Sequence, residues 1–176
     1  MNFKDIKKYT SNGHYQVNSP WRHFEEFYLN EKDKYHYFNI NPDYQRGHVW
    51  TSEQESKYIE HILRGGQQGK DLYFNCPGWM NNYQGPAEVV DGKQRIKAVL
   101  GFLHDTVKAF GYYCSEFESP YVGHLPSECE FIVHINDLPK RWMVLQWYLE
   151  MNAGMTIHTD EELNKVKILI EQEKNK

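Results

Sequence analysis

The polar residues of this chain that are best suited to chemistry lie in one short segment, Asp91 to Arg95, which reads Asp-Gly-Lys-Gln-Arg. An apolar run over residues 87–90 precedes it, and apolar residues at helical spacing follow it from Ile96 to Leu103. This pattern predicts a buried strand that turns sharply into a helix. The first turn of a helix has backbone N–H groups without an internal partner and carries the positive end of the helix dipole. Such a corner is suited to holding phosphate.

The residue types at this corner fit an anion and a metal ion. Gly92 allows a close approach of the backbone that a Cβ atom would block. Lys93 and Arg95 place positive charge where it opposes the helix dipole, at a cost of about 0.3–1 kcal/mol each, and a bound anion would reverse that cost. Arginine can bind phosphate oxygens in a bidentate way, and Asp91 could hold magnesium together with phosphate oxygens. The alternative is that Asp91 only caps the helix and that the basic side chains face solvent.

A second polar segment, Tyr44-Gln45-Arg46, lies in an expected loop that ends at Trp50. The asparagine, proline and glycine residues around it are typical of turns. Ser52, with a glutamate three residues later, predicts the capping box of a following helix. Taken alone, the segment is better explained by Tyr44 and Trp50 as core anchors and Arg46 as a surface cation.

A third segment, Asn152-Ala153-Gly154, follows a predicted helix over residues 138–149. By itself it indicates only the end of that helix. Thr159, again with a glutamate three residues later, predicts the start of a terminal helix.

Further elements must position these segments. Ser19 and Pro20 predict the start of a helix that ends near Leu29. The helix capped by Ser52 is expected to end at Leu63, before two glycines. Strands are expected at residues 35–38, 72–74, 87–90 and 131–135.

Together and in this order, the three polar segments resemble the N-terminal domain of GmrSD-type restriction systems, a large group of bacterial and phage proteins of the ParB/sulfiredoxin superfold. That family shows a Tyr-Gln-Arg-x-x-x-Trp box before a helix, an Asp-Gly-Gln-Gln-Arg strand–helix turn, and an Asn-x-Gly turn before a capped helix with glutamates. The corresponding boxes of this chain are residues 44–50, 91–95 and 152–154, and the resemblance covers residues 36–170.

The resemblance implies a fold, a ligand and a setting. The implied fold is a compact α+β domain of the ParB/sulfiredoxin type, with a small mixed sheet and a helical C-terminal part. The implied ligand is a nucleoside triphosphate, which several members of the family also hydrolyse, with magnesium or another divalent cation as the expected cofactor. The implied setting is DNA restriction and phage defence.

The resemblance also implies roles for individual residues. In the catalytic group, Asp91 would position metal or water, Gln94 would orient the attacking water or a phosphate oxygen, and Arg95 would bind phosphate. Arg46 would supply a second cationic arm, and Asn152 would line the same pocket. The other residues expected to bind the nucleotide are Tyr44, Gln45, Gly92 and Lys93.

Two departures from the family pattern bear on activity. Lys93 stands where the family usually has glutamine, which adds a positive charge and puts the hydrolytic role of that position in question. The chain ends at Lys176 without the nuclease half of longer members, and its nine histidines form no H-N-H-like metal box, so we expect no DNA cleavage by this chain alone. The alternative function is a non-enzymatic regulatory module, which binds DNA or a partner nuclease or defence subunit through the aromatic loop at residues 76–83.

Composition favours a folded cytoplasmic protein. Of the 176 residues, 40% are hydrophobic and 15% aromatic, and the net charge of −4 argues against a broad DNA-binding surface. We find no signal peptide and no apolar run long enough to span a membrane. Three cysteines without a C-x-x-C pair indicate reduced thiols. We expect an irregular N-terminal segment over residues 1–18 and a single domain over residues 19–172.

Overall fold

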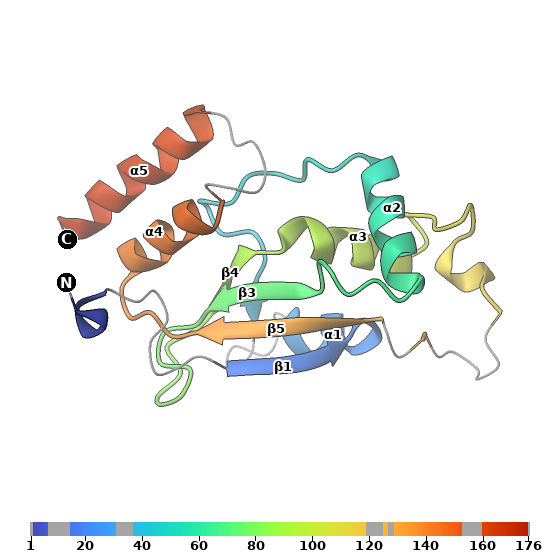
Figure 1. The fold of residues 1–176 in the computed structure, drawn as a ribbon, viewed down its shortest axis with the longest axis horizontal. Helices are drawn as coiled ribbons and strands as arrows, with labels where there is room; N and C mark the ends of the chain where they lie inside the picture. The colour runs from blue at the N-terminus through green and yellow to red at the C-terminus, as the bar shows by residue number, and fades with distance from the viewer. Residues whose placement is uncertain are drawn as a thin grey trace.

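The fold is built on a five-stranded sheet with the strand order β1-β5-β3-β4-β2 (Figure 1). The computed structural model describes residues 2–6, 15–30, 37–118, 125–126, 129–152 and 160–175. The strands are β1 (Tyr15–Pro20), β2 (Phe38–Asn39), β3 (Asp71–Asn75), β4 (Ala87–Asp91) and β5 (Glu130–Asn136). The β1–β5 and β3–β4 pairs are antiparallel, whereas the β3–β5 and β2–β4 pairs are parallel. The predicted α+β class with a small mixed sheet is therefore confirmed.

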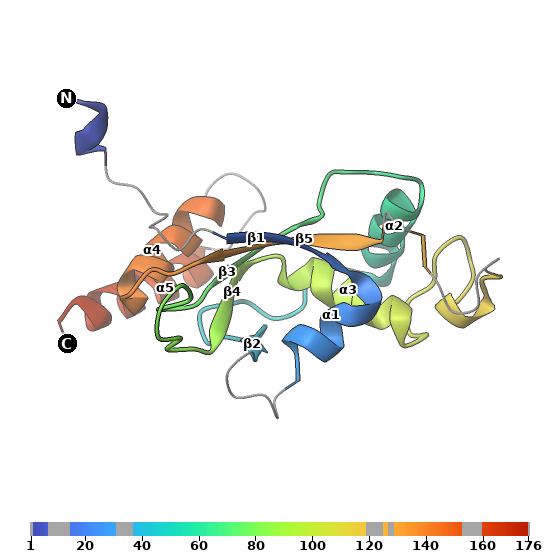
Figure 2. The ribbon, with the colours of Figure 1, turned by 90° about the horizontal axis from the view of Figure 1, so that it is seen from below.

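Five α-helices flank the sheet in the described part of the chain. They are α1 (Trp21–Tyr28), α2 (Ser52–Leu63), α3 (Lys93–Leu103), α4 (Arg141–Asn152) and α5 (Asp160–Lys174). Two short 3-10 turns, Phe3–Asp5 and Cys114–Glu116, complete the described elements. Figure 2 shows α1 and α3 on one side of the strands, while α4 and α5 pack together at the end of the sheet toward which β5 runs. None of the described helices is long and apolar enough to cross a membrane.

Two hydrophobic clusters hold these layers together. The larger cluster joins α1, α2 and α3 to the sheet, and its buried side chains include Trp21, Phe24, Ile59, Phe74, Val89, Ile96 and Phe131. The smaller cluster joins β4 to α4 and α5, and its buried side chains include Tyr44, Val90, Leu145, Tyr148, Val166 and Ile170. Successive residues of a strand point to opposite faces. Val89 and Val90 therefore place β4 between the two clusters, and the turn after β4 lies at their junction.

The N-terminal part of the chain differs from the sequence prediction. Residues 15–18, which were expected to be irregular, belong to β1, and Ser19 and Pro20 end this strand instead of beginning a helix. Helix α1 begins one residue later, at Trp21. The strand was missed because it lies at the edge of the sheet and most of its side chains are exposed, so its sequence lacks a clear apolar alternation.

The predicted N-cap of α2, Ser52, is wrong by one residue. The N-cap is Thr51, whose Oγ1 atom accepts a hydrogen bond from the Gln54 N–H at 3.3 Å. In return, the Oε1 atom of Gln54 accepts one from the Thr51 N–H at 2.8 Å. Both Thr51 and Ser52 can cap, and each has a suitable partner three residues later, so the sequence does not distinguish them. The predicted box at Thr159 and residues 35–36 of the predicted first strand lie outside the described residues.

Candidate functional site

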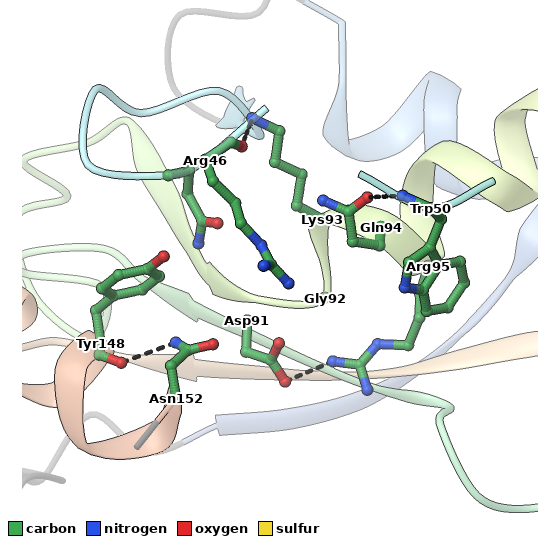
Figure 3. A pocket seen from close by; sticks show the side chains of 10 residues that line it. Arg46, Trp50, Asp91, Gly92, Lys93, Gln94, Arg95, Tyr148 and Asn152 are labelled. Atoms are coloured by element: carbon green, nitrogen blue, oxygen red, sulfur yellow. Dashed lines mark hydrogen bonds and ion pairs between the residues drawn. The ribbon is translucent and has the colours of Figure 1, made fainter. Parts of the chain in front are cut away.

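A cavity of about 280 Å³ lies where the turn between β4 and α3 meets the 44–50 loop and the C-terminal end of α4 (Figure 3). All three polar segments of the sequence contribute to it. Its lining residues are Gln45, Arg46, Trp50, Asp91, Gly92, Lys93, Gln94, Arg95, Tyr148 and Asn152. The structure thus brings together every residue predicted for the site except Tyr44.

The corner between β4 and α3 leaves the start of the helix without a side-chain cap. Gly92 is the N-cap, with a φ of +113°, and no side chain accepts a hydrogen bond there. The first intrahelical bond runs from the Ile96 N–H to the Gly92 carbonyl at 3.0 Å, so the N–H groups of residues 93–95 precede the helical ladder. A Cβ atom on Gly92 would lie 2.4 Å from Cδ2 of Leu72. The left-handed backbone and this close approach together require glycine.

The Gln94 side chain is bound to the backbone of the 44–50 loop. Its Oε1 atom accepts hydrogen bonds from the N–H groups of Val49 and Trp50, at 3.0 and 3.3 Å. Its Nε2 atom donates to the carbonyl oxygen of Gly47 at 3.1 Å. The amide oxygen, which the sequence analysis expected to orient a water or a phosphate oxygen, therefore already accepts two backbone N–H groups.

Lys93 also contacts the loop. The residue is only 7% exposed, and its Nζ atom donates a hydrogen bond to the carbonyl oxygen of Arg46 at 2.8 Å. Burial lowers the pKa of the Lys93 ammonium, and the positive charge of Lys97 lowers it further. Lys93 thus adds positive charge beside the cavity while its head group is held by the loop backbone.

The beginning of the loop is attached to β4. Strand β2 pairs with β4 only at residues 87–88, and side chains of the loop bind the carbonyl groups beyond. The Tyr44 hydroxyl donates to the Val89 carbonyl at 3.0 Å. The Nε2 atom of Gln45 donates to the carbonyls of Val89 and Val90, at 3.2 and 2.9 Å. Tyr44 is buried and anchors the loop, which explains why it does not line the cavity.

The two arginines of the site differ in their partners. Arg95 forms an ion pair with Asp91 in which Nη2 lies 2.5 Å from Oδ2, and the two side chains are 17% and 21% exposed. The guanidinium of Arg46 points into the cavity (Figure 3). Within the described part of the chain, this guanidinium has no hydrogen bond and no ion pair. Arg46 is therefore positioned to bind a ligand without breaking a contact to any other residue that the structure describes.

The lining residues do not fit a magnesium ion held by the protein. Asp91 is the single carboxylate among them, and its Oδ2 atom is already paired with Arg95. The described residues contain no group of three or more His, Cys, Asp and Glu side chains that could hold a metal ion. Magnesium sites usually combine one or two carboxylates with substrate phosphates, and here an arginine competes for the one carboxylate. The geometry thus gives no support to a metal role for Asp91.

Tyr148 and Trp50 line the cavity, although the sequence analysis did not assign them to the site. Tyr148 lies one helical turn before Asn152 on α4, and the Asn152 Nδ2 atom donates to the Tyr148 carbonyl at 2.8 Å. That spacing of four residues could have indicated it. Burial raises the pKa of the Tyr148 hydroxyl to about 12, against the opposing effect of the Arg46 charge. Trp50 packs against Tyr58 of α2 with 5.4 Å between ring centroids.

Comparisons with known proteins complete the description of the site. The family described as GmrSD restriction endonuclease, N-terminal domain, matches residues 24–176. Curated proteins and solved structures gave no significant match. The matched range contains every residue that lines the cavity.

Proposed function

Since this chain belongs to the family of the GmrSD restriction endonuclease N-terminal domain, we propose that it binds a nucleoside triphosphate in a restriction or defence system, with the triphosphate in the cavity beside α3. The observation that carries the proposal is the guanidinium of Arg46, which points into the cavity and has no hydrogen bond or ion pair among the described residues.

The charge of the cavity supports an anionic ligand. Three cationic side chains, those of Arg46, Lys93 and Arg95, line it together with one carboxylate, that of Asp91. The start of α3 adds the positive end of the helix dipole and N–H groups that precede the helical ladder. A phosphate chain with oxygens at these N–H groups and at Arg46 would neutralise several positive charges at once, whereas a neutral ligand would leave them unbalanced.

The size and the aromatic lining support a nucleotide. A cavity of about 280 Å³ lies just below the usual range of about 300–1,000 Å³ for small-molecule sites. The triphosphate therefore fills the cavity, and the base lies at its rim against an aromatic ring. Trp50 on the loop and Tyr148 on α4 offer such rings. Stacking of a base on an aromatic side chain contributes about 1–3 kcal/mol without selecting strongly among bases.

The contacts of the expected catalytic residues favour binding over hydrolysis. Gln94 is bound through both ends of its amide to the loop backbone, and Asp91 is paired with Arg95. Neither side chain is placed to activate a water without first losing these contacts. The domain is therefore a nucleotide-binding regulatory module, whose occupancy a partner nuclease or another defence subunit would detect.

Calorimetry with ATP, GTP, CTP and UTP, each with and without magnesium, tests this proposal. We expect a micromolar Kd for at least one triphosphate and a Kd at least about tenfold higher for Arg46→Ala, because a charge-assisted contact is lost. Arg22→Ala, which removes an exposed arginine of α1, is the matched control and should change the Kd by less than about twofold. Phosphate release, measured in parallel, should not exceed the rate of triphosphate hydrolysis in buffer without protein.

Two outcomes would contradict the proposal. The first is an absence of binding heat with all four triphosphates. The second is an equal loss of affinity in both arginine variants, which would assign the effect to net charge instead of to the cavity. Rapid phosphate release by the wild type would retain the binding site and replace the regulatory role by hydrolysis.

A further inference from the structure

We propose that Lys93 is a positioning residue, which fixes the peptide unit of Arg46 so that the Arg46 guanidinium points into the cavity. The inference rests on the proposed function for its ligand-binding readout only. It assigns the Lys93 ammonium to the loop backbone, where the sequence analysis expected it to bind the phosphate of the ligand.

Lys93 contacts the loop at the residue that carries the guanidinium. The bond of 2.8 Å from Lys93 Nζ to the Arg46 carbonyl joins the first residue of α3 to the middle of the loop. Figure 3 shows the Lys93 head group at this carbonyl, with the Arg46 guanidinium extending away from it toward Gly92 and Asp91. The bond therefore holds the backbone from which the guanidinium extends, on the side opposite to the cavity.

No other described side chain holds this part of the loop. Gln94 binds the loop backbone only from Gly47 onward. Gln45 attaches its own side chain to β4. Among the described contacts, the Lys93 ammonium is the one from a side chain to the backbone of Arg46. Loss of this ammonium should thus loosen Arg46 while the loop stays attached on both sides of it.

The Lys93 ammonium is also a buried charge. Lys93 is 7% exposed, and a buried ammonium is unfavourable unless its charge is balanced. Its hydrogen-bond partner within the described part of the chain is one neutral carbonyl, and Lys97 places a second cation nearby. An anion bound in the cavity would balance this charge through space. The arrangement is consistent with a site that is completed by its ligand.

A double-mutant cycle tests the inference, with inorganic triphosphate as the probe. The variants are Lys93→Met, Arg46→Ala and the double variant. We expect Lys93→Met to raise the Kd by about tenfold, because the Arg46 guanidinium is then no longer held in the cavity and must be ordered when the ligand binds. The double variant should bind within about threefold of Arg46→Ala alone, which is the loss allowed for charge by itself in Lys97→Met, because Lys93 otherwise acts through Arg46. Additive losses would overturn the inference, since they would mean that Lys93 contacts the ligand independently.

Lys97→Met is the matched control, because it removes the same charge one turn further along α3 without a bond to the loop in the structure. It should raise the Kd by less than about threefold. An equal loss of triphosphate affinity in Lys93→Met and Lys97→Met would overturn the inference, because the loss of one positive charge would then explain both. Should Lys93→Met fail to fold, Lys93→Gln, which keeps an uncharged donor, enters the same cycle with the same criterion of non-additivity.

Backbone ¹⁵N relaxation without ligand separates this inference from the proposed function. We expect lower order parameters at Arg46 and Gly47 in Lys93→Met than in the wild type, and unchanged values in Lys97→Met. An unchanged loop in Lys93→Met would overturn the positioning role, even where triphosphate binding is found. Absence of triphosphate binding by the wild type would instead contradict the proposed function, and the relaxation data would still decide the role of Lys93.

Discussion

Helices α2 and α3 both begin beside the 44–50 loop, but their first turns are completed in opposite ways. The start of helix α2 is capped by its own residues, since Thr51 and Gln54 form a capping box and two glutamates lie in the first turn. Helix α3 begins at Gly92 with no side-chain cap and with no acidic residue in its first turn. One helix start is capped by side chains of the fold, and the other has no side-chain cap.

This difference separates a stabilising helix terminus from one suited to a ligand. A capping side chain contributes about 1 kcal/mol, and an acidic residue in the first turn about 0.3–1 kcal/mol. Helix α3 lacks both contributions and carries Lys93 and Arg95 where the dipole disfavours them. A helix start that is unfavourable by itself, next to an arginine that points into the same cavity, is what an anion site requires.

The largest effect is expected from Gly92→Ala, which disrupts the open start of α3. The new Cβ atom would lie 2.4 Å from Leu72 at a φ of +113°. We expect the free energy of unfolding, measured by chemical denaturation, to fall by about 2–4 kcal/mol, the sum of backbone strain and overpacking. Gly65→Ala is the control, because its φ is +85° and nothing lies within 4 Å of the added atom. The free energy of unfolding of Gly65→Ala should fall by about 1 kcal/mol. An equal fall in the two variants would mean that the contact with Leu72 contributes nothing to the effect of Gly92→Ala.

Asp91→Asn makes the start of α3 more positive and so increases its difference from the start of α2. The substitution removes the negative charge that holds Arg95 at 2.5 Å, so Arg95 becomes available to the ligand. Isothermal calorimetry with inorganic triphosphate in a chelating buffer should show a Kd lower by about three- to tenfold. Weaker binding that is confined to buffers with magnesium would instead assign Asp91 to a metal ion.

The residues of the α3 corner could be predicted from the sequence because their signals are local. The glycine, the charge pattern and the apolar repeat from Ile96 onward all lie within a few residues of the turn. The three segments lie far apart in the chain, and their order in a family pattern placed them at one site. The structure places every residue predicted for the site except Tyr44 around one cavity.

The contacts of these residues could not be predicted, because they depend on the path of the loop. Gln94 and Lys93 bind backbone atoms that lie more than forty residues earlier in the chain. A sequence shows that an amide or an ammonium lies at a turn, but not which of the nearby acceptors it reaches. The same limit applied to β1, whose exposed edge position left no periodic signal.

A smaller effect is expected from the closed start of α2. Thr51→Ala removes the Oγ1 atom that accepts the Gln54 N–H, and we expect a loss of about 1 kcal/mol in the free energy of unfolding. Ser52→Ala, at the position that the sequence analysis chose as the cap, should change stability by less than about 0.5 kcal/mol, because its side chain is exposed. Neither variant should alter triphosphate binding. A larger loss of stability in Ser52→Ala than in Thr51→Ala would mean that Ser52 is the N-cap, as the sequence predicted.

The smallest effect concerns pH and the tyrosine beside the open helix start. Burial raises the pKa of Tyr148 in the folded protein to about 12, from 10.0. Below pH 10 the hydroxyl is protonated in both states, so its contribution to stability is fully present. Between pH 10 and 12 the unfolded chain loses the proton first, so the free energy of unfolding falls, by no more than about 1 kcal/mol at pH 11 after allowance for partial solvation.

Tyr148→Phe should therefore flatten the fall in Tm that thermal scans record between pH 10 and 12. Arg46 lowers the pKa of Tyr148 in the folded protein through its charge, so Arg46→Ala should leave the onset of the fall near pH 10, which the unfolded chain sets, and extend the fall to higher pH. A shift in that direction would locate the Arg46 charge beside Tyr148 without any ligand. A pH profile that is unchanged in Arg46→Ala would contradict the placement of this guanidinium in the cavity, and with it the contrast between the two helix starts.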